Sequence, residues 1–331
     1  MNKELLINRV IAILNTSGFI ISDRCDIRPR SFDLAARRDK LLLLIKVLYN
    51  IDGLNQETAG EMVFLSRHLK GCPVVIGEKT RDHSLEAGVA YYRYGIPALD
   101  LITLSDYLID KAPPLIYAEH GGLYVSIDGN ILKEERIKNN ISLGALASML
   151  GVSRRTVSKY EEGEMAASVD VVVRLEEILD KGFALAVGLF EQKDQGYNIK
   201  KDKQRHETDD VTVKKDPMNI LSFLKEMGFD VLPIAHAPFD AVSISSDRRD
   251  ENATILTGMG EYTNTTVKKA YLMSSISRVA HTESLLIVQG TSKIRNIERT
   301  VLVEDKELKT FNDKDDFIDL IQERRHKIEV I

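Results

Sequence analysis

One stretch of this chain, residues 132–179, constrains the fold more than any other, and it reads LKEERIKNNISLGALASMLGVSRRTVSKYEEGEMAASVDVVVRLEEIL. Ser142 can cap the start of a helix that runs to Leu150. Gly151 can end this helix in the left-handed conformation, which glycine adopts without strain because it has no Cβ atom. Ser153 can cap a second helix directly after the turn. The sequence therefore predicts two short helices that cross closely.

The apolar residues of this stretch fit a close crossing of two helices. Ala147 on the first helix is small, and Val157 on the second is β-branched, so the two backbones can approach each other. A later helix carries apolar residues on one face and can close the bundle. The predicted core consists of Leu146, Ala147, Leu150, Val152, Val157, Tyr160, Val171, Leu175, Ile178 and Leu179.

The spacing of Ala147, Gly151 and Val157, together with GVSRRTVSKYEEG, resembles the helix-turn-helix of the Cro/phage-repressor family. This resemblance covers residues 131–180. The segment directly upstream, HGGLYVSIDGNILKEERIKNN, is similar to archaeal transcriptional regulators of the same helix-turn-helix class. That second resemblance extends over the whole chain.

The resemblance implies that the second helix, residues 153–162, enters the major groove of duplex DNA with its N-terminal residues facing the base edges. Arginine can bind O6 and N7 of guanine together, whereas lysine and serine suit phosphate oxygens. The family reads two half-sites one DNA turn apart, which implies a two-fold homodimer. The expected DNA-binding residues are Ser153, Arg154, Arg155, Ser158 and Lys159.

One departure from the family pattern concerns the start of the first helix. Family members often place a phosphate-contacting Gln just after the cap, and here Leu143 and Gly144 stand there, so that contact is not expected. Three basic residues upstream, Lys133, Arg136 and Lys138, could supply other phosphate contacts or form a solvated helix face.

The rest of the chain divides into blocks. Residues 1–112 alternate helical and strand patterns, which predicts an α/β layer fold. Residues 115–190 are mostly helical, although 121–129 (GGLYVSIDG) predicts a short β element that ends in an Asp-Gly turn and packs the bundle or touches DNA as a wing. Residues 191–216 are nearly all polar, which predicts an exposed linker. Residues 217–331 form a second α/β block.

The second α/β block repeats the first in the order of its motifs. An apolar helix leads to Gly-Phe at 18–19 and again at 228–229, and then to Phe-Asp at 32–33 and again at 239–240. A further helix precedes an apolar strand in both blocks. We therefore predict an internal duplication.

The first block also resembles the PD-(D/E)xK nuclease and resolvase fold, through Glu4 on the opening helix, Asp33 on one strand and Lys46 on the next. That chemistry needs at least two carboxylates to hold Mg²⁺ and a lysine beside the attacking water. The second carboxylate should stand two residues before the lysine, where this chain has Leu44. Asp33 and Lys46 can instead form an ion pair at the strand ends.

The second block lacks the nuclease residues as well. Asp240 is present, but the matching segment ATILTGMGE offers no lysine in register, and Glu261 comes late. Two copies that both lack the ligand set predict a degenerate nuclease-like scaffold with no catalytic residues.

Composition excludes several other classes of protein. No apolar run approaches the roughly 20 residues that span a bilayer. The two cysteines and seven histidines show no metal-ligand spacing, and no glycine-rich phosphate loop is present, so neither a metal nor a cofactor is expected. The net charge of −5 does not argue against DNA, because DNA responds to the local charge of a surface. Residues 91–94 (YYRY) form an aromatic and basic cluster that packs internally or faces a partner.

The sequence thus predicts a cytoplasmic, homodimeric transcriptional regulator that binds duplex DNA sequence-specifically and is not an enzyme. Two alternatives stay open. One is a metal-dependent nuclease or resolvase that the helix-turn-helix targets to DNA. The other is an assembly protein that binds other proteins through its α/β repeats.

Overall fold

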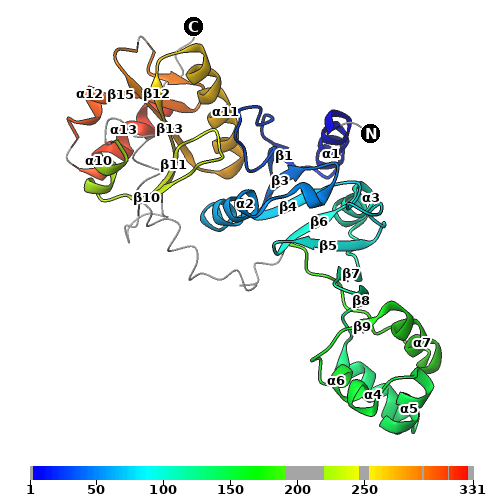
Figure 1. The fold of residues 1–331 in the computed structure, drawn as a ribbon. Helices are drawn as coiled ribbons and strands as arrows, with labels where there is room; N and C mark the ends of the chain where they lie inside the picture. Colours follow the sequence, from blue (N-terminus) through cyan, green and yellow to red (C-terminus); the bar gives the residue numbers. More distant parts are fainter. Residues whose placement is uncertain (1–2, 191–219, 246–252, 293, 312, 327–331) are drawn as a thin grey trace. The chain divides into compact units, whose positions relative to one another are not determined.

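The computed structural model describes residues 3–190, 220–245, 253–292, 294–311 and 313–326 (Figure 1). The predicted linker, residues 191–216, lies outside these ranges. The chain forms two compact units. Unit 1 comprises Met1–Ser17, Leu48–Leu54 and Val74–Lys193, and unit 2 comprises Gly18–Val47, Asn55–Pro73 and Asp194–Ile331. Within the described ranges, no helix combines the length and the apolar character that crossing a membrane requires.

The N-terminal α/β part alternates helices and strands, as predicted. Its elements are α1 (Lys3–Thr16), β1 (Ile20–Ile21), β2 (Leu34–Arg38), β3 (Leu41–Val47), the 3₁₀ turn η1 (Ile51–Gly53), α2 (Gln56–His68), β4 (Cys72–Ile76), β5 (Val89–Arg93), β6 (Ile96–Leu99), α3 (Leu101–Ser105) and the π-helical turn η2 (Asp106–Asp110). The strand β3, LLLLIKV, is buried along almost its whole length, as its continuous apolar run requires.

The C-terminal α/β part repeats this plan. Its elements are α10 (Ile220–Glu226), β10 (Asp230–Pro233), β11 (Ala241–Ile244), β12 (Thr254–Glu261), α11 (Asn264–Ala280), β13 (Glu283–Gln289), β14 (Asn296–Ile297), β15 (Thr300–Glu304), α12 (Asp305–Leu308) and α13 (Lys314–His326). The strand order β10-β11-β12-β13-β15-β14 reproduces the order β1-β2-β3-β4-β6-β5 of the N-terminal part. The predicted repetition of the α/β fold is therefore confirmed at the level of topology.

Two aspartates mark equivalent positions in the two α/β parts. Asp33 donates its N–H to the Ile45 carbonyl at 2.8 Å, and its Oδ2 accepts the N–H of Val47 at 2.8 Å. Asp240 makes the same two bonds to strand β12, at 2.8 and 2.7 Å. Each carboxylate thus holds the neighbouring strand at the same register, so the repetition reaches the level of single hydrogen bonds.

Unit 2 contains a hydrophobic core to which both α/β parts contribute. The N-terminal part supplies side chains from β2, β3 and α2, and the C-terminal part supplies side chains from β11, β12 and α11. We call it the shared core; its buried members are Cys25, Phe32, Ala35, Leu42, Leu44, Leu65, Leu69, Ile234, Phe239, Val242, Leu256, Leu272, Met273, Ile276, Val279 and Ala280.

Polar contacts reinforce the shared core at its edges. The guanidinium of Arg37, on β2, donates to the carbonyls of Val279 and Ala280 at 2.6 and 3.1 Å, where α11 ends and its carbonyl groups lack helical partners. The carboxylate of Glu61, on α2, accepts the backbone N–H of His236 at 2.7 Å and contacts the imidazole Nδ1 of the same residue at 2.5 Å. These bonds tie specific backbone positions of the two α/β parts together.

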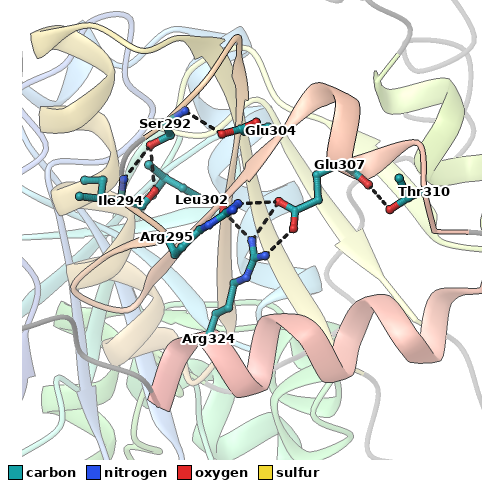
Figure 2. A network of polar contacts seen from close by, with 8 residues as sticks. All are labelled: Ser292, Ile294, Arg295, Leu302, Glu304, Glu307, Thr310 and Arg324. Atoms are coloured by element: carbon teal, nitrogen blue, oxygen red, sulfur yellow. Dashed lines mark hydrogen bonds and ion pairs between the residues drawn. The ribbon is translucent and has the colours of Figure 1, made fainter.

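A network of charged groups holds the last helices of the C-terminal part (Figure 2). Glu307, on α12, accepts bonds from the guanidinium of Arg324, on α13, and from Arg295 at 3.1 Å. Arg324 also donates to the carbonyl of Leu302 on β15 at 3.1 Å. One glutamate therefore joins α12 to α13 and to the loop before β14.

In unit 1, the N-terminal α/β part is followed by a helical part, which contains α4 (Gly129–Lys138), α5 (Leu143–Leu150), α6 (Arg154–Glu161) and α7 (Val169–Leu179). Three strands accompany it: β7 (Ile116–Glu119), β8 (Gly122–Val125) and β9 (Ala167–Ser168). β7 pairs in parallel with β5, and β8 pairs with both β7 and β9. The helical part is therefore joined to the sheet by strand hydrogen bonds as well as by the chain itself.

The predicted Asp-Gly turn in this region is wrong. The hairpin between β7 and β8 closes at positions 120 and 121, because Glu119 pairs with Gly122. Asp128 is instead the N-cap of α4, and its side chain accepts the N–H groups of Asn130 and Ile131 at 3.1 Å. Aspartate is favoured at both sites, so the dipeptide alone could not distinguish a hairpin turn from a helix start.

Candidate nucleic-acid interface

The two helices α5 and α6 form the predicted helix-turn-helix. The Ser142 hydroxyl accepts the N–H of Ala145 at 3.1 Å, and the Ser153 hydroxyl accepts the N–H of Thr156 at 3.0 Å. Between the helices, Gly151 has a φ of 70°, the left-handed conformation predicted for it. Both caps and the glycine turn are therefore confirmed, and they fix the direction in which α6 leaves α5.

The core of this small domain is also as predicted. Leu146, Ala147, Leu150, Val157 and Tyr160 are buried, and Leu175 and Leu179 of α7 close the cluster. Val152, Val171 and Ile178 pack against it from half-buried positions. Since Val157 and Tyr160 are buried, the side of α6 opposite to them faces outward.

The five expected DNA-binding residues lie on that outward surface. Ser153, Arg154 and Arg155 are exposed at the start of α6, and Ser158 and Lys159 are half-buried one turn later. The Ser158 hydroxyl donates to the Glu162 carboxylate at 2.7 Å. Arg154 and Arg155 stand in the first turn of the helix, where its N–H groups also attract anions, and Lys159 lies in the last turn.

Arg136, which the sequence offered as a phosphate contact, has a different role. It is 9% exposed, and its guanidinium forms a two-bond ion pair with the carboxylate of Glu161, with N–O distances of 2.5 and 3.0 Å. The hydrogen bond to Glu161 raises its pKa. Arg136 therefore fastens α4 to the end of α6, whereas Lys133 is exposed and Lys138 pairs with Glu135 at 3.0 Å.

A close backbone approach accounts for the glycine that starts α4. A Cβ atom on Gly129 would lie 2.4 Å from the Glu161 carbonyl oxygen and 2.5 Å from that of Tyr160. Only glycine lets the first turn of α4 touch the last turn of α6 this closely. Sequence reasoning missed this contact, because the signal that marks it, Asp-Gly, was assigned to a turn.

The nuclease-like position of the N-terminal part is filled by protein groups. Asp33 is fully buried, and its Oδ1 lies 2.9 Å from Nε of Arg30. Lys46 is 8% exposed, and its ammonium group donates to the Arg30 carbonyl at 2.7 Å. Leu44 belongs to the shared core. Within the described ranges, no group of three or more His, Cys, Asp or Glu side chains could hold a metal ion.

The C-terminal part differs at the same position. Gly258 stands in the register of Lys46, and a Cβ atom there would lie 2.8 Å from the sulfur of Met273, so a side chain at this position requires Met273 to move. The ammonium of Lys269, from α11, contacts Asp240 at 2.5 Å instead. Glu261 is exposed at the end of β12. The absence of a lysine in register, predicted from the sequence, is confirmed.

The aromatic cluster at 91–94 lies on β5 and the turn that follows it. Tyr91 is buried, and Arg93 pairs with the carboxylate of Asp52 at 2.6 Å. Tyr94 is 45% exposed in a left-handed turn with a φ of 53°. Tyr91 therefore packs internally, as one of the two predictions for this cluster has it, whereas the ring of Tyr94 faces outward.

Comparisons with known proteins match both kinds of domain. The PD-(D/E)XK superfamily domain matches residues 3–114, and the helix-turn-helix family matches residues 132–185. A solved complex of the SinR and SinI proteins aligns with 30% of this chain and 95% of the matched chain, at 21% identity and a TM-score of 0.16, a similarity too low to carry structural weight.

Full-length relatives come from archaea and are named HTH-type transcriptional regulatory proteins. The relative from Methanococcoides burtonii is 52% identical, over 99% of this chain and 100% of its own length. Relatives from Methanosarcina barkeri and Haloarcula marismortui are 50% and 42% identical, each over 98% of both chains. With this identity over its full length, the chain belongs to the archaeal family of HTH-type transcriptional regulatory proteins.

Proposed function

We propose that this chain is a transcriptional regulator that binds duplex DNA sequence-specifically and reads the major groove with the N-terminal half of α6. The observation that carries the proposal is the pair Arg154 and Arg155, exposed at the start of a helix whose opposite face is buried. The caps at Ser142 and Ser153 and the turn at Gly151 support it, because they hold α6 in the orientation that groove insertion requires.

The residue types at the start of α6 suit both kinds of DNA contact. Each arginine can bind O6 and N7 of a guanine together, which discriminates against other bases by about 1–3 kcal/mol. Lys159 and the hydroxyls of Ser153 and Ser158 suit phosphate oxygens, which position the protein without reading sequence. We propose these five residues as the DNA-binding surface.

We further propose that the protein works as a two-fold homodimer in the cytoplasm. Two copies of α6 would then meet two half-sites about one turn of DNA apart, so the operator should be an inverted repeat. We also propose that the chain has three domains, residues 1–112, 115–190 and 217–331, and that the two α/β domains flank the DNA-binding domain in the sequence.

The substitution Arg155→Ala tests the reading role of α6. Genome-wide recovery of bound DNA would supply the operator, and fluorescence anisotropy would give Kd for the operator and for random duplex. We expect Arg155→Ala to raise the operator Kd about 5- to 150-fold and to change the random-duplex Kd much less. Arg174→Ala removes the same charge from an exposed position of α7 and should leave the ratio of the two Kd values unchanged.

An equal rise in Kd for the operator and for random duplex would indicate that Arg155 contacts only phosphates, and it would contradict the reading role. No operator enrichment for the unmodified protein would contradict the proposed function as a whole.

We propose that the α/β parts are not enzymes, although the match to the PD-(D/E)XK superfamily and the presence of Asp33 and Lys46 favour a nuclease as the second candidate. Against it stands the burial of Leu44 at the position of the second carboxylate, because a leucine cannot bind Mg²⁺. Incubation of the full chain with Mg²⁺ and duplex or junction DNA should give no cleavage. Cleavage that Asp33→Ala abolishes would establish the nuclease.

A further inference from the structure

A cavity of about 840 Å³ opens in unit 1 where β5 and β7 separate. The two strands pair only at Val89 with Ile116 and at Ala90 with Tyr117. Beyond these pairs β5 continues beside β6, and β7 turns into the hairpin with β8. The cavity is lined by residues 91–94, by side chains of the loop 80–86, and by the tip of the hairpin. Its volume lies in the range of small-molecule sites.

Three tyrosines are among the residues that line this cavity, and the accessible rings are those of Tyr92, which is half-buried, and Tyr94, which is exposed. Tyr91 is buried, and its hydroxyl oxygen accepts the N–H of Glu86 at 3.2 Å, which fixes the ring against the loop. Burial raises the pKa of Tyr91 and of Tyr92, so both phenols stay neutral at physiological pH. Tyr94 adds a third, exposed ring. Neutral aromatic faces attract cations through their quadrupoles.

The charges around the cavity are mostly negative. Burial would raise the pKa of Asp52, but the Arg81 N–H and the Arg93 guanidinium outweigh it and hold the pKa below its ordinary value. This carboxylate and Arg93 therefore balance each other. Two further carboxylates line the cavity, Glu86 and Glu119, and neither forms an ion pair within the described ranges. The lining also includes His83 and His120 but no lysine, so its carboxylates outnumber its guanidinium and ammonium groups.

We propose that this cavity binds an organic cation, a protonated or quaternary amine, between the tyrosine faces and the carboxylates of Glu86 and Glu119. Aromatic rings combined with carboxylates are the groups that recognise alkylammonium ions. A neutral or anionic molecule of the same length lacks this attraction, and an anion is repelled by both glutamates.

The position of the cavity connects it to the helix-turn-helix. Glu119 is at the hairpin tip, while the other end of β8 pairs with β9 at Tyr124 with Ser168 and at Val125 with Ala167. β9 follows α6 and leads directly into α7. An amine held between Glu86 and Glu119 therefore restrains the same hairpin that carries the DNA-binding part. On the function proposed above, the amine is an effector that changes operator affinity.

Calorimetric titration of the full chain at pH 8, without DNA, tests the site. The probes are putrescine and choline, with 1,4-butanediol and succinate as matched neutral and anionic controls. We expect heats of binding for one or both amines and none for the controls. Glu119→Gln and Glu86→Gln should each weaken amine binding about tenfold. Glu164→Gln, an exposed glutamate outside the cavity, should have no effect. Binding of the diol, or amine affinity that neither cavity variant changes, overturns the site.

A second titration tests the link to DNA. Operator Kd is measured with and without the amine that binds, for the unmodified chain and for Glu119→Gln. We expect the amine to shift operator Kd in the unmodified chain only. An unchanged Kd despite calorimetric binding overturns the effector role and leaves the site intact. Because the first titration contains no DNA, a failure of the DNA-binding proposal cannot be mistaken for a failure of the cavity.

Discussion

Glu307 shows at the scale of one residue how charge holds the C-terminal part together (Figure 2). Burial would raise its pKa, but Arg324 and Arg295 outweigh this and lower the pKa below the ordinary value of 4.5. A carboxylate with a lower pKa in the folded state stabilises the fold above the unfolded-state pKa. That contribution is lost as the pH falls through the folded-state pKa.

We expect Glu307→Gln to lower the free energy of unfolding at pH 7 by about 1 kcal/mol, a modest value because water partly screens the network. The difference from the unmodified chain should shrink as the pH falls below 4.5. Calorimetric Tm values between pH 3 and 7 provide the measurement. Glu226→Gln, an exposed glutamate at the end of α10, is the control. A Tm difference that stays constant with pH would contradict the linkage.

Arg136 illustrates which residue roles a sequence leaves open. Its partner, Glu161, lies on another helix, and nothing local distinguishes it from the exposed Lys133 three positions earlier. The caps at Ser142 and Ser153 were predictable because their partners lie three residues along the chain. Local bonds can be derived from spacing, whereas a buried ion pair depends on how whole helices pack.

At the scale of the element, the turn between α5 and α6 depends on one glycine. A Cβ atom on Gly151 would meet nothing within 4 Å, so the cost of a side chain there comes from its positive φ alone. We expect Gly151→Ala to destabilise α5 and α6 by about 1–2 kcal/mol. Gly151→Asn should lose less, because asparagine tolerates this conformation. Hydrogen exchange of the α5 and α6 amides measures both effects.

Gly144 is the matched control within the same element. It lies inside α5, and the nearest atom to an added Cβ, the Ser142 hydroxyl, is 4.0 Å away. Gly144→Ala should therefore stabilise α5 by about 0.5–1 kcal/mol through helix propensity. If alanine had the same effect at both positions, the left-handed turn would not be the cause.

Two strands show what the sequence pattern could not determine. Residues 91–94 were interpreted only as an aromatic and basic cluster, because strand β5 (VAYYR) is short and ends in Tyr-Tyr-Arg. β3 was predicted, but its run of apolar residues could not show which face meets the C-terminal part. Side chains on both faces are apolar, so only the packed structure assigns Leu42 and Leu44 to the shared core.

At the scale of the whole molecule, the shared core predicts that the two α/β parts stay associated without a covalent connection. We expect a chain cut within residues 191–216 by an inserted protease site to elute as a single species in gel filtration. Leu44→Asp, which places a charge in the shared core, should make the two fragments of the cut chain separate. Ile20→Asp should not, because that side chain is 58% exposed on β1. Separation of the unmodified fragments would contradict this prediction.

The shared core also limits which substitutions the two α/β parts can accept. Leu44 and Leu256 occupy equivalent positions in the two parts, and both are fully buried in one cluster. A carboxylate at either position would place an uncompensated charge among the apolar side chains of both parts. The packing of each part therefore constrains substitutions in the other, and these two positions should vary together with the volume of their neighbours.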